Sequence, residues 1–391
     1  MRLIWEERQT SRAEIARRLG LSRSTAGEVV GDLLEMGLVI PAGMARPQGG
    51  RPPAMLEFND GAGYCLGVEM GATHVSVALI DLRGRVLVWK NEPHPVRDDP
   101  VGTRALMAAC CAACLAELPG SSRLLIGIGV AAPCPVDPAH PDRFSEIVLP
   151  AWGGRAGLRS LARRYQVPLF VDNDANLGAL SEGRWGGGRG VEDFTYVKLG
   201  TGVGSGHFLR GAIYRGATGV AGEIGHLAMD PQGKLCLCGL RGCLTTLVGT
   251  AALVERCTEL LGEYPGSALA RTRPTITSIE DAALAGDPLG LRVAREVAGY
   301  LGIAVAGLLN ILNPRLVILG GGLSRLGDVL LEPVREVISR RALVTSRAAT
   351  EVTTSNLGPQ SIALGAATLV LDAALADARL IPVVRAWVAS R

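Results

Sequence analysis

Four potential metal ligands lie close together in the second half of the chain, in the pattern H-x9-C-x-C-x4-C. They are His226, Cys236, Cys238 and Cys243. One imidazole and three thiolates form the ligand set of a closed tetrahedral zinc site, because both donor types suit this borderline-soft ion. All four coordination positions are then filled by protein, so the predicted role is structural. The alternative is a chance group of buried thiols in a chain with nine cysteines.

A second group of polar residues follows the apolar run at residues 167–171. Asn173 and Asp174 come where this expected strand ends and faces a predicted cleft. Carboxylates and amides in a fixed array are suited to bind the vicinal hydroxyls of a sugar. The same residues are also favoured caps for a helix that begins near Ala175. Both interpretations can hold together.

The elements expected around these residues form two similar units. Residues 64–68 and 75–80 read as strands that flank a glycine-containing turn, and residues 194–199 precede the glycine-rich segment 200–206. Glycine lets backbone N–H groups approach phosphates closely, although tight hairpins need it too. The recurrence predicts a duplicated α/β fold with a cleft between two lobes.

The first sixty residues have a different pattern, typical of a helix-turn-helix. Residues 11–14 have the spacing of a capping box, and Gly20 is placed to end the first helix. Ser22 can cap a second helix, whose expected buried stripe is Ala26, Val29, Val30, Leu33 and Leu34. The opposite face at its start carries Ser22, Arg23, Ser24, Thr25 and Glu28, which are the predicted DNA contacts. The alternative is a small helical cap domain without a DNA role.

Two short expected strands, residues 38–40 and 55–58, flank a Pro/Gly-rich loop that would be the wing. Within this loop Arg51 follows two glycines, a setting that suits insertion into a narrow and electronegative minor groove. We therefore add Arg51 to the predicted DNA contacts. The alternative is a solvated linker charge.

Composition limits the classes of protein that are possible. The chain has 391 residues, 48% of them hydrophobic and 20% charged, so it is expected to be globular with two or three domains. Its net charge of +3 is too small to indicate nucleic acid by itself, and lysine occurs only at positions 90, 198 and 234. The apolar run at residues 300–312 is shorter than the ~20 residues that a membrane span needs. We expect a soluble, cytoplasmic protein with reduced cysteines, no signal peptide and no membrane partner.

Seven segments in order make residues 64 to about 376 resemble the ROK family of repressors and sugar kinases. The matching segments are 69–73, 133–137, 172–176, 200–206, 223–226, the cysteine cluster and 319–322. The resemblance implies a two-lobed actin-like fold of the hexokinase type, α/β in class, with a structural zinc. Together with the winged helix-turn-helix, the whole chain resembles the xylose-repressor and N-acetylglucosamine-repressor branch.

The resemblance also assigns roles to residues of the predicted cleft. It implies that Asn173, Asp174, Glu223 and His226 bind sugar hydroxyls, with His226 binding zinc as well. In the kinases of the family, the residue matching Asp174 is the general base that accepts the proton of the attacking hydroxyl. Zinc loading would then help to position the His226 ring in the sugar site.

Several residues depart from the pattern of the family's kinases. Glu69 replaces an aspartate of the first phosphate loop, Ala72 and Cys134 replace glycines, and Thr245 replaces a glutamate. Val148 stands where an asparagine is common. Phosphoryl transfer depends on precise positioning, so a displaced magnesium carboxylate is costly, whereas binding without turnover tolerates it. We therefore predict no catalytic residues and no enzyme activity.

The predicted protein is a sugar-responsive transcription regulator, most simply a repressor of carbohydrate-metabolism genes. Its expected domains are a winged helix at 1–60, a lobe I at 61–185 completed by 362–391, and a lobe II at 186–361. Its expected partners are operator DNA, a sugar effector and a second copy in a homodimer or dimer of dimers. The alternatives are an ATP-dependent sugar kinase with residual activity and a DNA-binding protein with a ligand-blind cleft.

Overall fold

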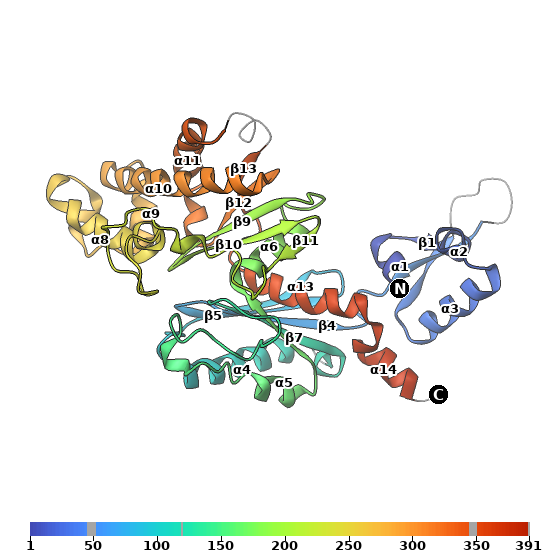
Figure 1. The fold of residues 1–391 in the computed structure, drawn as a ribbon. Coiled ribbons are helices and arrows are strands. Elements are labelled where there is room, and N and C mark those ends of the chain that lie inside the picture. The colour runs from blue at the N-terminus through green and yellow to red at the C-terminus, as the bar shows by residue number, and fades with distance from the viewer. Residues whose placement is uncertain (45–51, 119, 344–349, 390–391) are drawn as a thin grey trace.

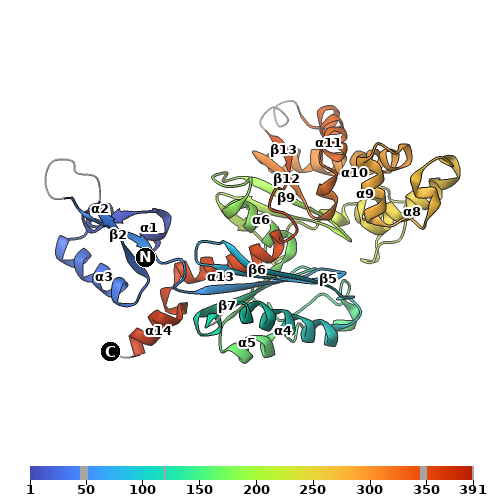
Figure 2. The ribbon, with the colours of Figure 1, turned by 180° about the vertical axis from the view of Figure 1, so that it is seen from behind.

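The computed structural model describes residues 1–44, 52–118, 120–343 and 350–389. These residues form a small N-terminal domain and two larger units, each built on a five-stranded sheet (Figure 1). We call the unit on the first of these sheets lobe I and the unit on the second lobe II. The N-terminal domain lies beside lobe I, on the far side of the molecule from α8 (Figures 1 and 2).

The N-terminal domain has the predicted helix-turn-helix followed by a small sheet of order β1-β3-β2. Its elements are α1 (Arg2–Glu6), β1 (Thr10–Ser11), α2 (Arg12–Leu19), α3 (Arg23–Glu35), β2 (Val39–Met44) and β3 (Ala54–Phe58). Ser11 caps α2 by accepting from the Glu14 N–H, and Ser22 caps α3 by accepting from the Thr25 N–H. Gly20 ends α2 at a φ of +64°, a left-handed conformation that glycine adopts without steric cost.

Two details of this domain differ from the prediction. Val29 is 45% exposed and is not part of the buried stripe of α3, which consists of Ala26, Val30 and Leu33 with Leu34 half-buried. The Glu14 carboxylate accepts from Arg17 and Arg18 on its own helix, so the predicted reciprocal capping box is wrong in its second half. Nearby arginines offer this exposed carboxylate charged partners, which make stronger hydrogen bonds than a backbone amide.

Lobe I is a mixed sheet of order β6-β5-β4-β7-β8 with helices on both faces (Figure 1). Its elements are β4 (Tyr64–Met70), β5 (His74–Asp81), β6 (Val86–Pro93), α4 (Pro100–Ala116), β7 (Leu125–Ala132), α5 (Arg159–Tyr165) and β8 (Leu169–Asn173). The three cysteines of α4, Cys110, Cys111 and Cys114, are buried core residues. Their thiols therefore pack as small apolar groups.

Lobe II repeats this strand pattern, with the order β11-β10-β9-β12-β13. Its strands are β9 (Phe194–Leu199), β10 (Val203–Leu209), β11 (Ala212–Tyr214), β12 (Leu316–Gly320) and β13 (Glu351–Thr354). Its helices are α7 (Thr245–Val248), α8 (Thr250–Leu260), α9 (Ile276–Leu284), α10 (Pro288–Leu312) and α11 (Asp328–Arg341). In both sheets the central strand pairs antiparallel with one neighbour and parallel with the other, which agrees with the predicted duplication.

Helix α10 is the one described helix that is long and apolar enough to cross a membrane by length and composition. Half of its most apolar window is buried inside the protein, and it packs against α8, α9 and α11. Its apolar character is therefore explained by its place in the core of lobe II.

Two helices lie between the sheets and connect the lobes, α6 (Asp174–Trp185) and α13 (Ser361–Ala376) (Figures 1 and 2). They pack against each other so closely that a Cβ on Gly365 would lie 1.8 Å from the Leu177 carbonyl oxygen. Glycine is therefore required at this crossing. Helix α13 also contacts β4 and β7 of lobe I, while the predicted domain limits stay a prediction.

Candidate functional site

The four predicted metal ligands come together in lobe II. Their ligand atoms all lie within 4.8 Å of one another. The His226 Nδ1 atom is 3.6 Å from Cys236 Sγ, and Cys238 Sγ is 3.6 Å from Cys243 Sγ. A tetrahedral zinc ion with Zn–S bonds of about 2.3 Å separates its ligand atoms by about 3.5–3.8 Å. The cluster therefore fits a zinc ion in both donor chemistry and spacing.

A tightly folded loop holds these ligands in place. Short antiparallel bridges join Leu235 to Arg241 and Ala228 to Cys243. Gly242 has a φ of +64°, and a Cβ there would lie 1.5 Å from the Asp230 carbonyl oxygen. Only glycine permits this reversal, which brings Cys243 back beside the rest of the cluster.

Asn173 caps α6, as one of the two interpretations predicted. Its Oδ1 accepts from the N–H groups of Ala175 at 2.9 Å and Asn176 at 3.2 Å, while its Nδ2 donates to the Cys134 carbonyl oxygen at 3.2 Å. Both lone pairs of the amide oxygen are thus used, and one N–H of the amide is left for a ligand. The cap also fixes the position of the next residue, Asp174.

Asp174 is buried at the start of α6 and forms an ion pair with Lys198 from the end of β9. Burial lowers the pKa of Lys198, but the carboxylates of Asp174 and Glu69 outweigh it, so this pKa lies above its ordinary value. The ammonium group therefore keeps its proton. A second ion pair, between Arg215 of lobe II and the buried Asp172 of lobe I, joins the lobes nearby.

Glu223 and His226 lie on the lobe II side of the same junction. Glu223 Oε2 is 3.6 Å from His226 Nε2, while the other ring nitrogen of His226 faces the cysteines. Burial, followed by the negative charge of Asp174, raises the pKa of Glu223 to about 7. The negative charge of Asp174 contributes to this shift, so the predicted sugar residues of the two lobes influence one another electrostatically. The His226 ring links them to the metal cluster.

Glu69 is the further acidic residue that lobe I contributes beside Asp174. It lies at the end of β4, is buried, and has an Oε1 atom 3.5 Å from the Nε2 atom of His74. We define the interlobe site as Asp174 with its neighbouring cap residue, the charged groups that pair with it or interact with it electrostatically, and the histidine beside Glu223. It consists of Glu69, Asn173, Asp174, Lys198, Glu223 and His226.

The glycine-rich segment 200–206 differs from the expected loop. Strand β10 already begins at Val203, so only residues 200–202 form the turn, and Gly204 and Gly206 are strand residues. A Cβ on Gly206 would lie 2.3 Å from the Ala175 carbonyl oxygen. This glycine therefore serves the close packing of α6 on the sheet, and the predicted loop was too long.

Two of the residues that depart from the kinase pattern have clear surroundings. Val148 is half-buried and packs on the apolar core of lobe I. Thr245 begins α7 and lies beside the turn at Gly202: a Cβ on that glycine would be 3.8 Å from the Thr245 hydroxyl oxygen.

Two open cavities of about 820 and 860 Å³ lie elsewhere, and neither is lined by a residue of the interlobe site.

The predicted DNA-contacting face of α3 is exposed over its first turn. The exposed residues are Ser22, Arg23, Ser24, Thr25 and Glu28. The Ser22 hydroxyl oxygen is 2.8 Å from the hydroxyls of both Ser24 and Thr25, which orders the polar start of the helix. Arg51 and the wing loop around it lie outside the described residues.

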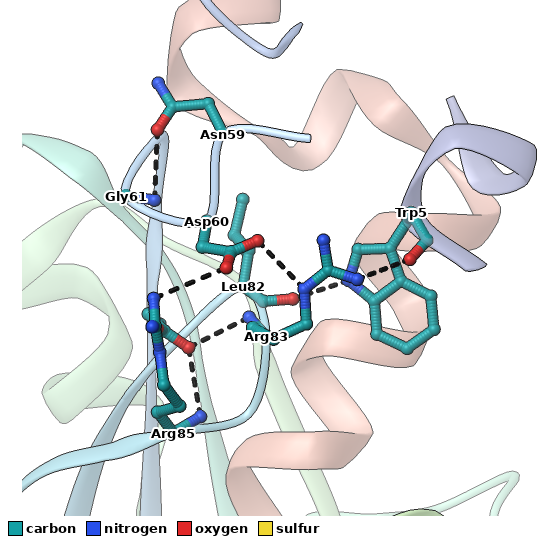
Figure 3. A network of polar contacts seen from close by, with 8 residues as sticks. Trp5, Asn59, Asp60, Gly61, Leu82, Arg83 and Arg85 are labelled. Carbon is teal, nitrogen blue, oxygen red and sulfur yellow. Dashed lines mark hydrogen bonds and ion pairs between the residues drawn. The ribbon is translucent and has the colours of Figure 1, made fainter. Parts of the chain in front are cut away.

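A polar joint connects the N-terminal domain to lobe I (Figure 3). The Trp5 indole N–H donates to the Leu82 carbonyl oxygen at 2.6 Å. Arg83 donates to the Trp5 carbonyl oxygen at 2.5 Å and to Asp60 at 2.9 Å, and its guanidinium lies 5.6 Å from the Trp5 ring centroid. The contacts tie α1 to the hairpin after β5.

Apolar packing continues this joint into the core. Ile4, Leu38 and Phe58 of the N-terminal domain belong to one buried cluster with Leu82 of lobe I. Val384 of α14 (Pro382–Ala389) is part of the same cluster. Because the domains share a hydrophobic core, the N-terminal domain is packed firmly against lobe I.

The sequence interpretation missed Lys198, Arg215 and the Trp5–Arg83 joint. Lysine is rare in this chain, and one of its three lysines lies two residues before the glycine turn at residues 200–202, which is a signal that could have identified Lys198. No comparable signal existed for the other residues, because their partners are far away in the sequence.

Comparisons with known proteins agree with this architecture. The family model described as ROK family matches residues 65–373, and the model described as winged helix-turn-helix DNA-binding matches residues 1–40. The xylose repressor of Bacillus subtilis is 30% identical over 93% of this chain and 91% of its own length. The DNA-binding transcriptional dual regulator NagC of Escherichia coli is 31% identical over 96% and 91%.

Solved structures give the same picture. A ROK family transcriptional regulator, described as a homologue of the E. coli MLC protein, has a TM-score of 0.80 and 25% identity, covering 96% of this chain and 95% of that one. A ROK family glucokinase from Streptomyces griseus, in complex with glucose and AMPPNP, has a TM-score of 0.68 and 29% identity. It covers 78% of this chain and 99% of its own.

The winged helix and the kinase-like lobes together define a DNA-binding transcription regulator built on a sugar-kinase scaffold. The chain belongs to the ROK family and is one of its transcriptional repressors, related to xylose repressors and NagC. The B. subtilis xylose repressor and the MLC-like regulator each match more than 90% of this chain, whereas the glucokinase structure covers 78% of it and has the lower TM-score.

Proposed function

We propose that this repressor is controlled by a sugar that binds at the interlobe site and changes its affinity for operator DNA. One observation carries the proposal: a polar site between two lobes and an exposed recognition helix occur in one chain, joined by a shared core. Asn173, Asp174, Glu223 and His226 would bind the sugar hydroxyls, and zinc held by His226 and the three cysteines would fix the His226 ring. We place the protein in the cytoplasm, where its operator is found.

The proposed mechanism is a thermodynamic linkage between the two sites. A sugar that binds better to one arrangement of the lobes shifts the protein toward that arrangement. In a homodimer or dimer of dimers, the shift would change the spacing of two recognition helices, and operator half-sites demand a defined spacing. The packed joint between the N-terminal domain and lobe I supports this route, because a movement of lobe I would carry α3 with it.

A sugar kinase with residual activity is the second candidate, favoured by the likeness to the glucokinase structure. A catalytic base must be free to accept the proton of the attacking hydroxyl. Here the Asp174 carboxylate is bound to Lys198, and Thr245 lies beside the glycine turn where a glutamate is usual. We therefore infer that the chain binds sugar without phosphorylating it.

The experiment that tests the effector site compares the wild-type protein with Asp174→Asn. Zinc-loaded protein is titrated by calorimetry with D-xylose, D-glucose and N-acetyl-D-glucosamine, and operator binding is measured in parallel. We expect one sugar to bind, and the substitution to weaken it about tenfold or more, since charged hydrogen bonds are among the stronger contacts. Unchanged sugar affinity in the variant would place the effector elsewhere.

The proposed DNA surface gives a separate prediction. Arg23→Ala is expected to weaken operator binding about tenfold or more, because an arginine contact to a base edge or phosphate at a recognition-helix start is lost. Arg340→Ala is the control, since Arg340 is an exposed arginine of α11 in lobe II and its removal changes the net charge equally. Mobility-shift titrations at a fixed salt concentration give both values. Equal affinities for the two variants would argue against α3 as the reading helix.

A further inference from the structure

Lys198 occupies an unusual position in the interlobe site. It is the penultimate residue of β9, where it shares the α6-facing side of the sheet with Tyr196, whose ring lies against Gly178 of α6. Its ammonium group donates to the Asp174 carboxylate, and the two side chains are only 18% and 8% exposed. A strand of lobe II is thereby tied to the residue that the proposed function uses to bind the sugar.

The surroundings of this ion pair are acidic. The Glu69 carboxylate acts on both partners, and Asp174 in turn acts on Glu223. The nearby cations already form ion pairs: Lys198 binds Asp174, and Arg215 binds Asp172. His74 likewise lies beside Glu69, so among the residues that the structure describes none of these cations is left without a carboxylate partner to receive an anionic ligand.

This balance of charge favours one class of ligand. A sugar hydroxyl can donate to the Asp174 carboxylate and accept from one of the remaining N–H groups of the Lys198 ammonium. A phosphate dianion brought to the same place would meet Glu69, Asp174 and Glu223 without a free positive partner. Like charges that meet in a partly buried site are costly.

We propose that Lys198 is a specificity-determining residue of the interlobe site. Lys198 holds Asp174 in place as the acceptor for a sugar hydroxyl, and it thereby makes the site select an uncharged sugar over the phosphate ester of that sugar. The inference rests on the proposed function, because it names the chemical class of that effector. It also assigns a ligand-binding role to a residue that the predicted sugar set does not include.

The test is a calorimetric titration of the full-length, zinc-loaded protein with matched pairs of ligands. D-Glucose is compared with glucose 6-phosphate, N-acetyl-D-glucosamine with its 6-phosphate, and D-xylose is added as a pentose. We expect one uncharged sugar to bind, and to bind at least tenfold more tightly than its 6-phosphate where the pair exists. A phosphate ester that binds as tightly as the free sugar, or more tightly, would overturn the inference.

Variants separate a ligand contact from a merely structural counter-ion. Lys198→Met is expected to weaken sugar binding at least tenfold, and Lys198→Arg to restore part of the affinity. The double variant Lys198→Met/Asp174→Asn removes both charges, so it tests the fold without leaving a buried charge unpaired. We expect it to keep its zinc and its melting temperature but not its sugar affinity. Full sugar affinity in the double variant would show that Lys198 only neutralises Asp174, and would overturn the inference.

The outcomes also distinguish this inference from the proposed function. Operator affinity that responds to a phosphate ester but not to a free sugar would leave the proposed function intact and overturn the selection by charge. A protein that binds none of these ligands, with operator affinity unaffected by all of them, would overturn the proposed function and the inference together.

Discussion

Replacing Cys243 by serine is expected to remove the metal from the lobe II loop and to weaken effector binding about tenfold or more. Cys243 is fully buried and its Sγ atom is 3.6 Å from that of Cys238, so the loss of one thiolate leaves an incomplete ligand set. His226 would lose its fixed orientation toward Glu223. Replacing a group that orients a metal ligand typically lowers metal affinity or activity 10- to 100-fold, and we expect a loss of similar size when the metal that orients His226 is removed.

The measurement is the zinc content per chain by mass spectrometry, together with the melting temperature and a sugar titration. Cys257→Ser is the matched control, because Cys257 is also fully buried in lobe II but lies outside the cluster. We expect the control to keep one zinc per chain while Cys243→Ser keeps none. A Cys243→Ser protein with full zinc content would show that the four residues do not form a metal site.

The double substitution Trp5→Ala/Arg83→Ala is expected to uncouple the sugar from the DNA. It removes the hydrogen bonds from Trp5 to Leu82 and from Arg83 to Trp5 and Asp60, together with the cation–π contact (Figure 3). These contacts are together worth about 2–4 kcal/mol by typical values. We expect the sugar-induced change in operator affinity to fall at least fivefold, while the sugar affinity itself stays within twofold of the wild type.

The control for this pair is Arg85→Ala. Arg85 is drawn beside Arg83 in Figure 3, carries the same charge, and binds Asp81 and Asp60 without touching Trp5. Operator affinity is measured by mobility shift with and without sugar, and sugar affinity by calorimetry. If the double variant responds to sugar as the wild type does, the signal does not pass through this joint.

Local signals in the sequence predicted much of the fold. The caps at Ser11 and Ser22 and the left-handed Gly20 depend on neighbouring residues, so the two helices of the helix-turn-helix were placed correctly. The metal cluster could be predicted from the sequence in the same way, because all its ligands lie within one short loop. Interactions of this short range can be read from spacing alone.

Errors and omissions arose where distant segments meet. Gly206 was assigned to a loop, but its real constraint is the approach of α6 from another part of the chain. Val29 has helical spacing for the core, yet the small domain has nothing to cover it. Lys198 and Arg83 acquire their roles from partners 24 and 78 residues away, so local spacing does not identify those partners.

The most direct test of the central claim is the linkage between sugar and operator. Operator affinity is measured by mobility shift with the chain's own upstream DNA and a scrambled duplex, at near-physiological salt, with and without each sugar of the panel. The sugar affinity is then measured with and without operator. We predict that one sugar changes operator affinity, and that operator changes the affinity for that sugar by the same factor, as linkage requires. Selective operator binding that no sugar alters, with sugar binding unaffected by DNA, would contradict the account.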